Sequence, residues 1–368
     1  MQITEVELVP LALPFTRPYV TARGSLERRE MALLRLVTDS GLVGLGEAVF
    51  LSLRGGAGLA EVDRSLRKVA RRLRRAGLAD FAGPEPLRAA IDVFIHASAG
   101  RRMPAPAKTA LEMALFDLAG KASNKPLWEL LGAERCEPVR CNATLVAGEP
   151  REVAADAQRW TERGFSTFKL KLGTGDDLAQ VRAVREAVGP QARLRLDANG
   201  AWSVQEALGL LRMAEPLGLE LVEQPVAELA GMAEITAATN VLVVADESVT
   251  GGKQAQRAAK AKACDLATVK LAKVGGIGEA NGIAGHLPIY LSSALDGPLG
   301  IAAAAQAAQA LSFSGPAADL AHGLATQELF ADTHAARGPS LDGDELLPPE
   351  GPGLGVELDD EALERNRI

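Results

Sequence analysis

The sequence predicts an α/β protein that combines a (β/α) barrel with an α+β capping domain, the latter built from the N-terminal region and the C-terminal tail. Two patterns carry this prediction. After Cys141, short apolar runs alternate with helical patterns in seven or eight successive units, which is typical of parallel strands buried under helices in a barrel. Before Cys141, strand patterns come first and helical patterns follow, which indicates a segregated α+β unit.

The first part of the chain predicts an antiparallel sheet followed by helices. ITEVELVPLAL and MALLRLVTDSGLVGLGEAV are β-rich, and Asp39-Ser40-Gly41 is a hairpin-turn signal. Helical patterns follow over residues 58–76, 84–97 and 106–121. We therefore place the capping domain at residues 1–130.

The barrel is predicted over residues 131–330. Its strands are expected in eight stretches: CNATLV, TFKLKLG, RLRLDAN, LELVEQP, VLVVADES, LATVKLAKVGG, PIYLSSALDG and DLAHGLA. Helical patterns such as PREVAADAQRWTERG separate them. The tail, residues 331–368, is rich in Gly and Pro, and we expect it to return to the capping domain.

Composition excludes several classes of protein. A chain that is 47% hydrophobic and 24% charged is typical of a globular domain, and no uninterrupted apolar run is long enough to span a membrane. The net charge of -7 argues against general nucleic-acid binding, and the basic run over residues 65–77 has the apolar spacing of a solvated helix. Three unpaired cysteines and an N-terminus without a secretory pattern predict a cytoplasmic protein.

Charged residues fall late in five of the predicted strands. Lys171, Asp197, Glu223, Asp246 and Lys270 follow one another at steps of 26, 26, 23 and 24 residues, about one βα unit each. In a barrel, the late end of every strand lies on the rim where catalytic loops gather. The sequence therefore predicts three carboxylates and at least two lysines in one cup.

This set of side chains predicts a divalent metal site. Three carboxylates without His or Cys form a hard oxygen site, which suits Mg²⁺, with Mn²⁺ possible and zinc less favoured. Lys169 and Lys171 leave the same face of their strand, so we expect mutual repulsion to lower the pKa of a lysine towards general-base duty. The alternative is a purely structural layer of buried lysine–carboxylate ion pairs.

Together, KLKLG, LDANGAW, VEQP, ADES and VKLAKVGG resemble the enolase superfamily in its muconate-lactonizing subgroup. The resemblance implies a modified TIM barrel, Asp197, Glu223 and Asp246 as Mg²⁺ ligands, and a homo-oligomer. It also implies that Lys171 and Lys270 lie on opposite faces of a small-molecule carboxylate, with Lys169 assisting Lys171. The chemistry implied is removal of a proton α to that carboxylate to give an enediolate.

Within the subgroup, three stretches resemble o-succinylbenzoate synthases: PFTRPYVTARGSLERREMALLRL, PIYLSSALDGPLGIAAAAQAAQAL and DLAHGLATQELF. This resemblance implies a lyase that dehydrates a cyclohexadiene carboxylate in menaquinone biosynthesis. The polar loop Thr21–Arg28 is expected to close over the barrel mouth. The candidate substrate-binding residues are Ser292, Ser293, Asn199, Asp296 and Arg23.

Several other functions remain open. Dipeptide epimerases of the L-Ala-D/L-Glu type present an Asp-x-Asp near the last strand, where this chain has Asp319-Leu320-Ala321. Muconate cycloisomerase and N-acylamino acid racemase are further alternatives. Two alternatives lie outside the superfamily. A Schiff-base lyase would also use a barrel lysine, but it has no need of three acids on adjacent strands. A non-catalytic barrel that binds a carboxylate through a metal has no need of the two candidate catalytic lysines. His322 is placed near the last strand, either against substrate or as a structural residue.

Overall fold

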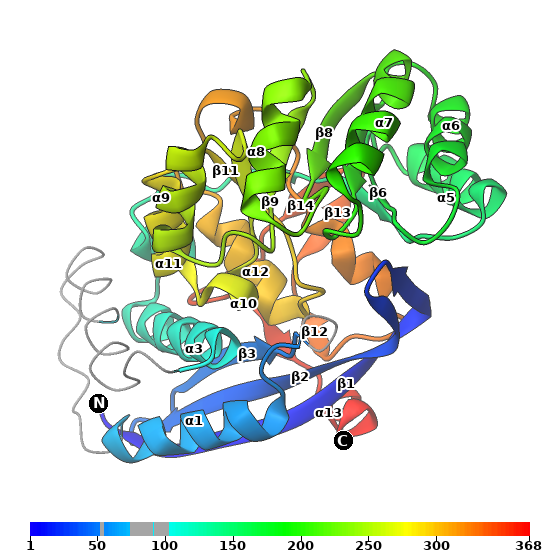
Figure 1. Cartoon of the computed structure of the whole chain (residues 1–368). Coiled ribbons are helices and arrows are strands. Elements are labelled where there is room, and N and C mark those ends of the chain that lie inside the picture. The colour runs from blue at the N-terminus through cyan, green and yellow to red at the C-terminus, as the bar shows by residue number, and fades with distance from the viewer. Residues whose placement is uncertain (52–54, 74–90, 92–102) are drawn as a thin grey trace.

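The structure is a computed structural model, and it describes residues 1–51, 55–73, 91 and 103–368. A three-stranded sheet lies below a barrel of strands and helices in the view of Figure 1. Of the predicted capping helices, the one over residues 84–97 lies outside the described residues apart from Ile91. The other two are α1 (Leu59–Leu73) and α3 (Ala105–Ser123).

The capping sheet is an antiparallel meander of β1 (Ile3–Thr21), β2 (Gly24–Thr38) and β3 (Val43–Val49). Alternate residues of β1 from Val9 to Phe15 are buried, as a sheet with one face on the core requires. Helix α3 lies between this sheet and the barrel, and is buried on nearly all sides (Figure 1). Gly46 allows the close approach, because a Cβ there would lie 2.9 Å from the carbonyl carbon of Ala110.

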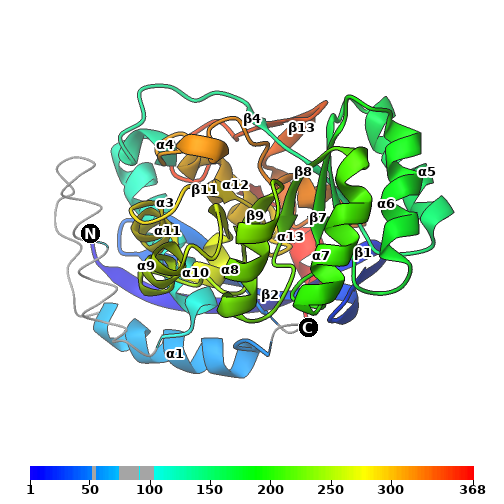
Figure 2. The same cartoon turned by 45° about the horizontal axis from the view of Figure 1, so that its top comes forward.

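The barrel contains a seven-stranded parallel sheet in the order β11-β10-β9-β8-β7-β6-β5. Its strands are β5 (Ala143–Leu145), β6 (Thr167–Lys171), β7 (Arg193–Asp197), β8 (Leu219–Glu223), β9 (Leu242–Ala245), β10 (Leu266–Val269) and β11 (Ile289–Leu291). Helices cover the outside of these strands (Figure 2). They are α5 (Pro150–Glu162), α6 (Asp177–Val188), α7 (Val204–Ala214), α8 (Leu229–Ala238), α9 (Gly252–Ala261), α11 (Ile277–Ala284) and α12 (Pro298–Ala307).

The eighth predicted strand, DLAHGLA, is not a strand. Its residues form only two isolated bridges, Cys141 with His322 and Ser292 with Gly323. Gly323 must stay small, because a Cβ there would lie 2.5 Å from the hydroxyl oxygen of Ser292. These bridges connect the segment after β11 to the segment before β5. Two bridging residues thus close the ring where a full strand was expected.

The remaining α-helices and β-strands of the described residues are short. They are α4 (Leu127–Leu130), β4 (Val139–Arg140), α10 (Leu271–Val274) and the tail's β12 (Ala335–Arg337), β13 (Ser340–Asp342), β14 (Glu345–Leu347), β15 (Glu357–Leu358) and α13 (Asp360–Asn366). Strand β14 pairs with β4, whereas α13 packs on β1. The tail therefore contacts both the entry to the barrel and the capping sheet.

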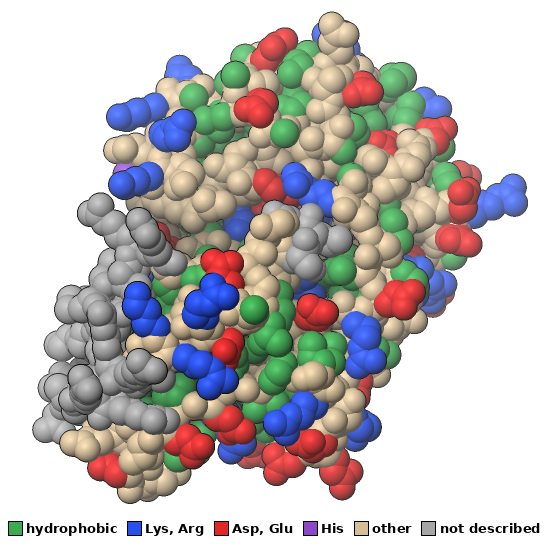
Figure 3. All heavy atoms as spheres, turned by 60° about the horizontal axis from the view of Figure 1, so that its bottom comes forward, with side chains coloured by type: hydrophobic (Ala, Val, Ile, Leu, Met, Phe, Trp, Pro, Cys, Tyr) green, Lys and Arg blue, Asp and Glu red, His purple; other side chains and the backbone are tan. Residues whose placement is uncertain are grey.

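The face that carries α1 mixes both signs of charge (Figure 3). Val62, Leu66 and Val69 of α1 are buried, whereas Arg67 and Lys68 are exposed, as expected for a solvated amphipathic helix. No helix within the described ranges is long and apolar enough to cross a membrane.

Candidate active site

The charged residues predicted for the rim do end consecutive strands. Lys171 is the register partner of Asp197, and Asp197 is the partner of Glu223. Asp246 directly follows β9, and Lys270 directly follows β10. All five are buried. Because the strands are parallel and in register, these five residues lie at one end of the sheet. A one-residue slip of any strand would turn its side chain to the opposite face.

Ion pairs connect the lysines to the carboxylates. Oδ2 of Asp197 lies 2.9 Å from Nζ of Lys169 and 2.6 Å from Nζ of Lys171. Lys270 Nζ lies 2.6 Å from Oδ2 of Asp246, and Lys273, which was not predicted, lies 2.8 Å from Oδ1 of the same residue. The carboxylates thus offset the repulsion between the ammonium groups of Lys169 and Lys171, which share one face of their strand.

The expectation of a lowered lysine pKa is wrong for the chain alone. Burial favours the neutral form of Lys169, but Asp197 and Glu223 outweigh it, and the pKa rises well above its ordinary value. For Lys171, burial is likewise outweighed by Asp197, so its pKa is raised. The same lysines hold the pKa of Asp197 far below its usual range against the effect of burial. The acids, rather than the neighbouring lysine, decide the sign.

The two oxygens of Glu223 have different surroundings. Oε2 accepts hydrogen bonds from Lys169 Nζ at 2.7 Å, from Thr268 Oγ1 at 2.9 Å and from the hydroxyl group of Tyr290 at 2.6 Å. Oε1 is buried, accepts no hydrogen bond from any residue that the structure describes, and lies 3.9 Å from Nζ of Lys270. A buried carboxylate oxygen without a hydrogen bond is costly unless something else coordinates it.

The donor set fits a hard divalent cation. Asp197, Glu223 and Asp246 offer only oxygen ligands, and Oε1 of Glu223 has no hydrogen bond from a described residue. In the part of the chain that the structure describes, no three acidic, imidazole or thiol groups converge as a metal cluster. Lysine ammonium groups contact Asp197 and Asp246 instead. The carboxylates therefore have the charge and the oxygen ligands that a cation needs, but they do not surround a common point.

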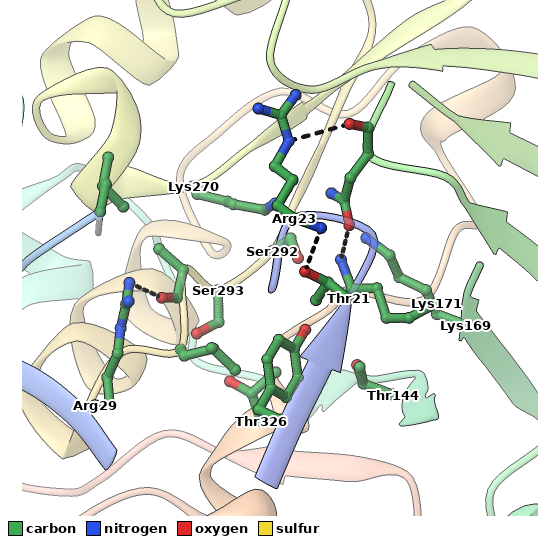
Figure 4. Close-up of a pocket in the computed structure, with 15 residues that line it drawn as sticks. Thr21, Arg23, Arg29, Thr144, Lys169, Lys171, Lys270, Ser292, Ser293 and Thr326 are labelled. Carbon is green, nitrogen blue, oxygen red and sulfur yellow. Dashed lines mark hydrogen bonds between the residues drawn. The ribbon is translucent and has the colours of Figure 1, made fainter. Parts of the chain in front are cut away.

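A pocket opens onto Lys169, Lys171 and Lys270. Figure 4 shows Lys270 on one side of it and Lys169 with Lys171 on the other. In the sheet, β7, β8 and β9 separate the two sides, and these are the strands that carry or precede the three acids. A purely structural ion-pair layer would not need to open on a pocket. The lining residues are Tyr19, Thr21, Arg23, Arg29, Leu51, Thr144, Lys169, Lys171, Asn199, Lys270, Ser292, Ser293, Ala294, Leu295 and Thr326.

The tip of the capping hairpin reaches the barrel rim. Nε of Arg23 donates to the backbone oxygen of Asn199 at 3.1 Å and lies 3.7 Å from Oε1 of Glu247 (Figure 4). Asn199 has a positive φ of 48° and accepts from Lys171 Nζ at 3.3 Å through its side chain. The loop predicted at Thr21–Arg28 is instead a tight turn at the barrel mouth, because β1 continues to Thr21 and β2 begins at Gly24.

The predicted substrate-binding residues after β11 divide into two groups. Ser292 and Ser293 line the pocket. Asp296 does not; its Oδ2 accepts from Ser293 Oγ at 2.9 Å and from the Ala294 amide at 2.7 Å. Its place is therefore behind the pocket wall, where it orients the serine.

Several lining residues were not among the predicted site residues, including Tyr19, Arg29 and Thr326. Tyr19 stacks with Phe15, at 5.6 Å between ring centroids, and Arg29 donates to the Ala294 carbonyl at 2.6 Å. Thr326 is buried, and its hydroxyl group has no hydrogen-bond partner among the described residues. All three lie in stretches that resemble o-succinylbenzoate synthases, Tyr19 and Arg29 within residues 14–36 and Thr326 within residues 319–330, but no pattern in those stretches distinguishes them as lining residues.

The segment 319–321 is turned away from this pocket. The backbone oxygen of Asp319 accepts from Arg193, which begins β7 and so lies at the opposite end of the sheet from the lysines. His322 Nδ1 accepts from the Leu291 amide at 3.0 Å, and burial, followed by Arg195, lowers the pKa of His322 to about 3. His322 is therefore a structural residue, and neither it nor Asp319 lines the pocket.

Comparison with known families agrees with this geometry. The N-terminal domain model of mandelate racemase and muconate lactonizing enzyme matches residues 3–132, and the enolase C-terminal domain-like model matches residues 152–362. The chain belongs to the enolase superfamily. Its relatives place it in the muconate-lactonizing subgroup of that superfamily.

Individual relatives in the superfamily have several activities. The chain is 33% identical to L-Ala-D/L-Glu epimerase of Bacillus subtilis over 97% of both chains. It is also 33% identical to N-succinylamino acid racemase of Thermus thermophilus over 97% of this chain and 95% of the relative. These names favour the isomerase alternatives over the dehydration predicted first.

Solved structures give the same result. The substrate-liganded Bacillus subtilis epimerase matches with a TM-score of 0.87 at 31% identity, over 98% of this chain and 100% of that chain. Dipeptide epimerase of Enterococcus faecalis V583, complexed with Mg and the dipeptide L-Leu-L-Tyr, matches with a TM-score of 0.86 at 30% identity, over 97% of this chain and 100% of that chain. The modified barrel with its capping domain is therefore shared with these proteins.

Proposed function

We propose that this enzyme moves a proton between the two faces of the α-carbon of an N-acylated amino acid, and so acts as a racemase or epimerase. The observation that carries the proposal is that Lys171 and Lys270 line one pocket from opposite sides. A two-sided arrangement suits a reaction that removes the proton from one face and returns it on the other.

We further propose Asp197, Glu223 and Asp246 as ligands for Mg²⁺, with Mn²⁺ as a possible substitute. The chemistry that the cation supplies is neutralisation of these carboxylates and stabilisation of the negative charge that develops on the substrate carboxylate. In the chain alone, those carboxylates raise the pKa of Lys169 and Lys171. Chelation is expected to abolish activity, and added Mg²⁺ or Mn²⁺ to restore it; full activity of metal-free protein would contradict the assignment.

The lysines and the hairpin tip would have different roles in the proton transfer. One of Lys171 and Lys270 accepts the α-proton, and the other donates a proton to the opposite face of the resulting enediolate. Lys169, held between Asp197 and Glu223, contributes fixed positive charge beside Lys171. The hairpin tip with Arg23 covers the mouth and limits the access of water, which strengthens electrostatic interactions inside the pocket.

The charge of the pocket supports an acylated rather than a free amine. Arg23 and Arg29 line it together with the three lysines, and no aspartate or glutamate is among its described lining residues. A substrate ammonium group would find no carboxylate there, whereas an acyl arm that ends in a carboxylate would find cations. We therefore favour an N-succinylamino acid over a dipeptide with a free N-terminus.

The test is an assay of purified protein with Mg²⁺ in D₂O, followed by ¹H NMR of the α-proton. N-succinyl-L-amino acids, L-Ala-L-Glu and the cyclohexadiene substrate of o-succinylbenzoate synthase would be compared. We expect the N-succinyl compounds to lose the α-proton signal and to racemise. Exchange of the dipeptide alone would favour a dipeptide epimerase, against which the absence of a second acid at Ala321 was an argument. Dehydration without exchange would restore the synthase prediction.

A further inference from the structure

The capping domain holds the pocket wall after β11 from behind. Residues 292–295 line the pocket, and α12 begins at Pro298, immediately after them. Glu47, on β3 of the capping domain, accepts a hydrogen bond from the Gly297 amide through Oε1 at 2.7 Å. A carboxyl group from one domain therefore caps a helix of the other, which satisfies an amide that the helix itself leaves unpaired.

The fit between Glu47 and the helix start is close. A Cβ at Gly297 would lie 2.5 Å from Oε2 of Glu47, and one at Gly300 would lie 2.9 Å from Oε1. Only glycine at both positions leaves room for the carboxyl group. Glu47 itself is 1% exposed, so this contact is an interior one.

A short chain of contacts connects the helix start to the pocket. Asp296, next to Gly297, binds both Ser293 Oγ and the Ala294 amide. Leu295 has a φ of +64°, a left-handed conformation that a leucine keeps only when its surroundings hold it there. A shift at Gly297 would therefore reach Ser293 within a few bonds.

We propose that Glu47 is a positioning residue, which sets the pocket wall at residues 292–296 by capping α12 from the docked capping domain. It does not touch the pocket and acts through Gly297 and Asp296. The expected effect on catalysis rests on the proposed function, whereas the effect on the wall itself does not.

The chain offers a matched control in Glu112 of α3. This residue is also a buried acid of the capping domain, and it caps α11 by accepting from the amides of Ile277 at 2.5 Å and Gly278 at 3.0 Å. Neither amide belongs to a residue that lines the pocket. Removing either acid takes a buried inter-domain cap from a barrel helix, but only one of the two helices follows the pocket wall.

The experiment compares Glu47→Leu, Glu47→Asp, Glu47→Gln and Glu112→Leu in the full chain, by amide hydrogen exchange and by steady-state kinetics. In Glu47→Leu and Glu47→Asp we expect faster exchange over residues 292–300 and a KM about five- to tenfold higher, as for one lost hydrogen bond. Glu47→Gln keeps an acceptor oxygen and should stay near wild type. Glu112→Leu should speed exchange over residues 277–280 and leave KM unchanged.

Two results would overturn the proposal: unchanged exchange over residues 292–300 in both Glu47→Leu and Glu47→Asp, or an equal rise of KM in Glu112→Leu. If Glu47→Leu does not fold, the shorter side chain of Glu47→Asp carries the same comparison. Hydrogen exchange needs no substrate. If the protein were inactive on every compound assayed, the proposed function would be refuted. The exchange data would still decide whether Glu47 positions the pocket wall.

Discussion

The hydroxyl group of Tyr290 lies 2.6 Å from Oε2 of Glu223 and donates a hydrogen bond to it. Lys169 and Thr268 donate to the same oxygen, whereas Oε1 accepts no hydrogen bond from any described residue and is the oxygen that we propose as the metal ligand. The ring of Tyr290 is itself held beneath the guanidinium of Arg195, 5.3 Å from the ring centroid. Tyr290 is therefore expected to orient a metal ligand rather than to react.

Replacing Tyr290 by Phe should weaken Mg²⁺ binding by about tenfold, in the range seen when a partner of a metal ligand is lost. The ring and its contact with Arg195 stay, so the Tm should change little. Calorimetric titration with Mg²⁺, or Mn²⁺ titration followed by electron paramagnetic resonance, measures the affinity without turnover. Wild-type affinity in this variant would show that the hydroxyl group does not orient Glu223.

Single lysine substitutions should separate the two faces of the substrate. Lys171→Ala and Lys270→Ala are each expected to abolish racemisation, with a loss of about 10³-fold or more. Each variant should still exchange the α-proton of one substrate enantiomer, and the two variants should exchange opposite enantiomers.

The measurement is ¹H NMR in D₂O with each pure enantiomer. The contrary result is that Lys171→Ala loses all exchange while Lys270→Arg retains turnover. That result would mean a single acid–base with Lys270 as fixed charge, since guanidinium stays protonated, and it is the pattern expected of a syn-dehydratase.

Arg23→Ala should raise KM and lower kcat together, because it removes the contact between the hairpin tip and Asn199. We expect changes of about five- to tenfold in each, as for a hydrogen bond that involves a charged group. Arg67→Ala is a suitable control, since Arg67 is an exposed arginine of α1. Unaltered kinetics in Arg23→Ala would exclude a lid function for this turn.

Glu47 should make the free energy of unfolding fall as pH rises between about 4.5 and 8. Burial, followed by Asp296, raises the pKa of Glu47 to about 8, so the folded chain binds a proton that the unfolded chain releases near pH 4.5. Stability from this group is complete below pH 4.5 and is lost as pH rises to about 8. His334, 3.7 Å away, has a pKa lowered by burial to about 4, and it costs stability only as pH falls below 6.5.

The window between pH 6.5 and 8.5 therefore isolates Glu47 from His334. Tm should fall across this window in wild type and fall less in Glu47→Gln, which cannot ionise. Thermal unfolding at several pH values measures this slope. Parallel slopes for the two proteins would show that Glu47 titrates normally.

The sequence by itself determined the barrel and the charged end of its strands. The period of about one βα unit between Lys171 and Lys270 is a property of the chain, and parallel strands in register convert it into a common rim. The three acids and the lysines could be named because each residue stands at the end of its own strand, where local pattern and position agree.

Only the tertiary structure decided the sign of the lysine pKa shifts and the closure of the ring. Lys169 and Lys171 are two residues apart in the sequence, but Asp197 and Glu223 approach them from other strands and dominate the electrostatics. The last segment closes the barrel through two bridging residues, His322 and Gly323. The hydropathy pattern of such a segment is the same as that of a strand.

The same holds for Tyr290, Arg29 and Glu47, whose roles depend on partners far away in the sequence. Glu47 and Gly297 are 250 residues apart, and Tyr290 and Glu223 are 67 apart. Periodicity reports which face a side chain takes within its own element. Which group from another element meets it there depends on how the capping domain, the barrel and the tail pack together.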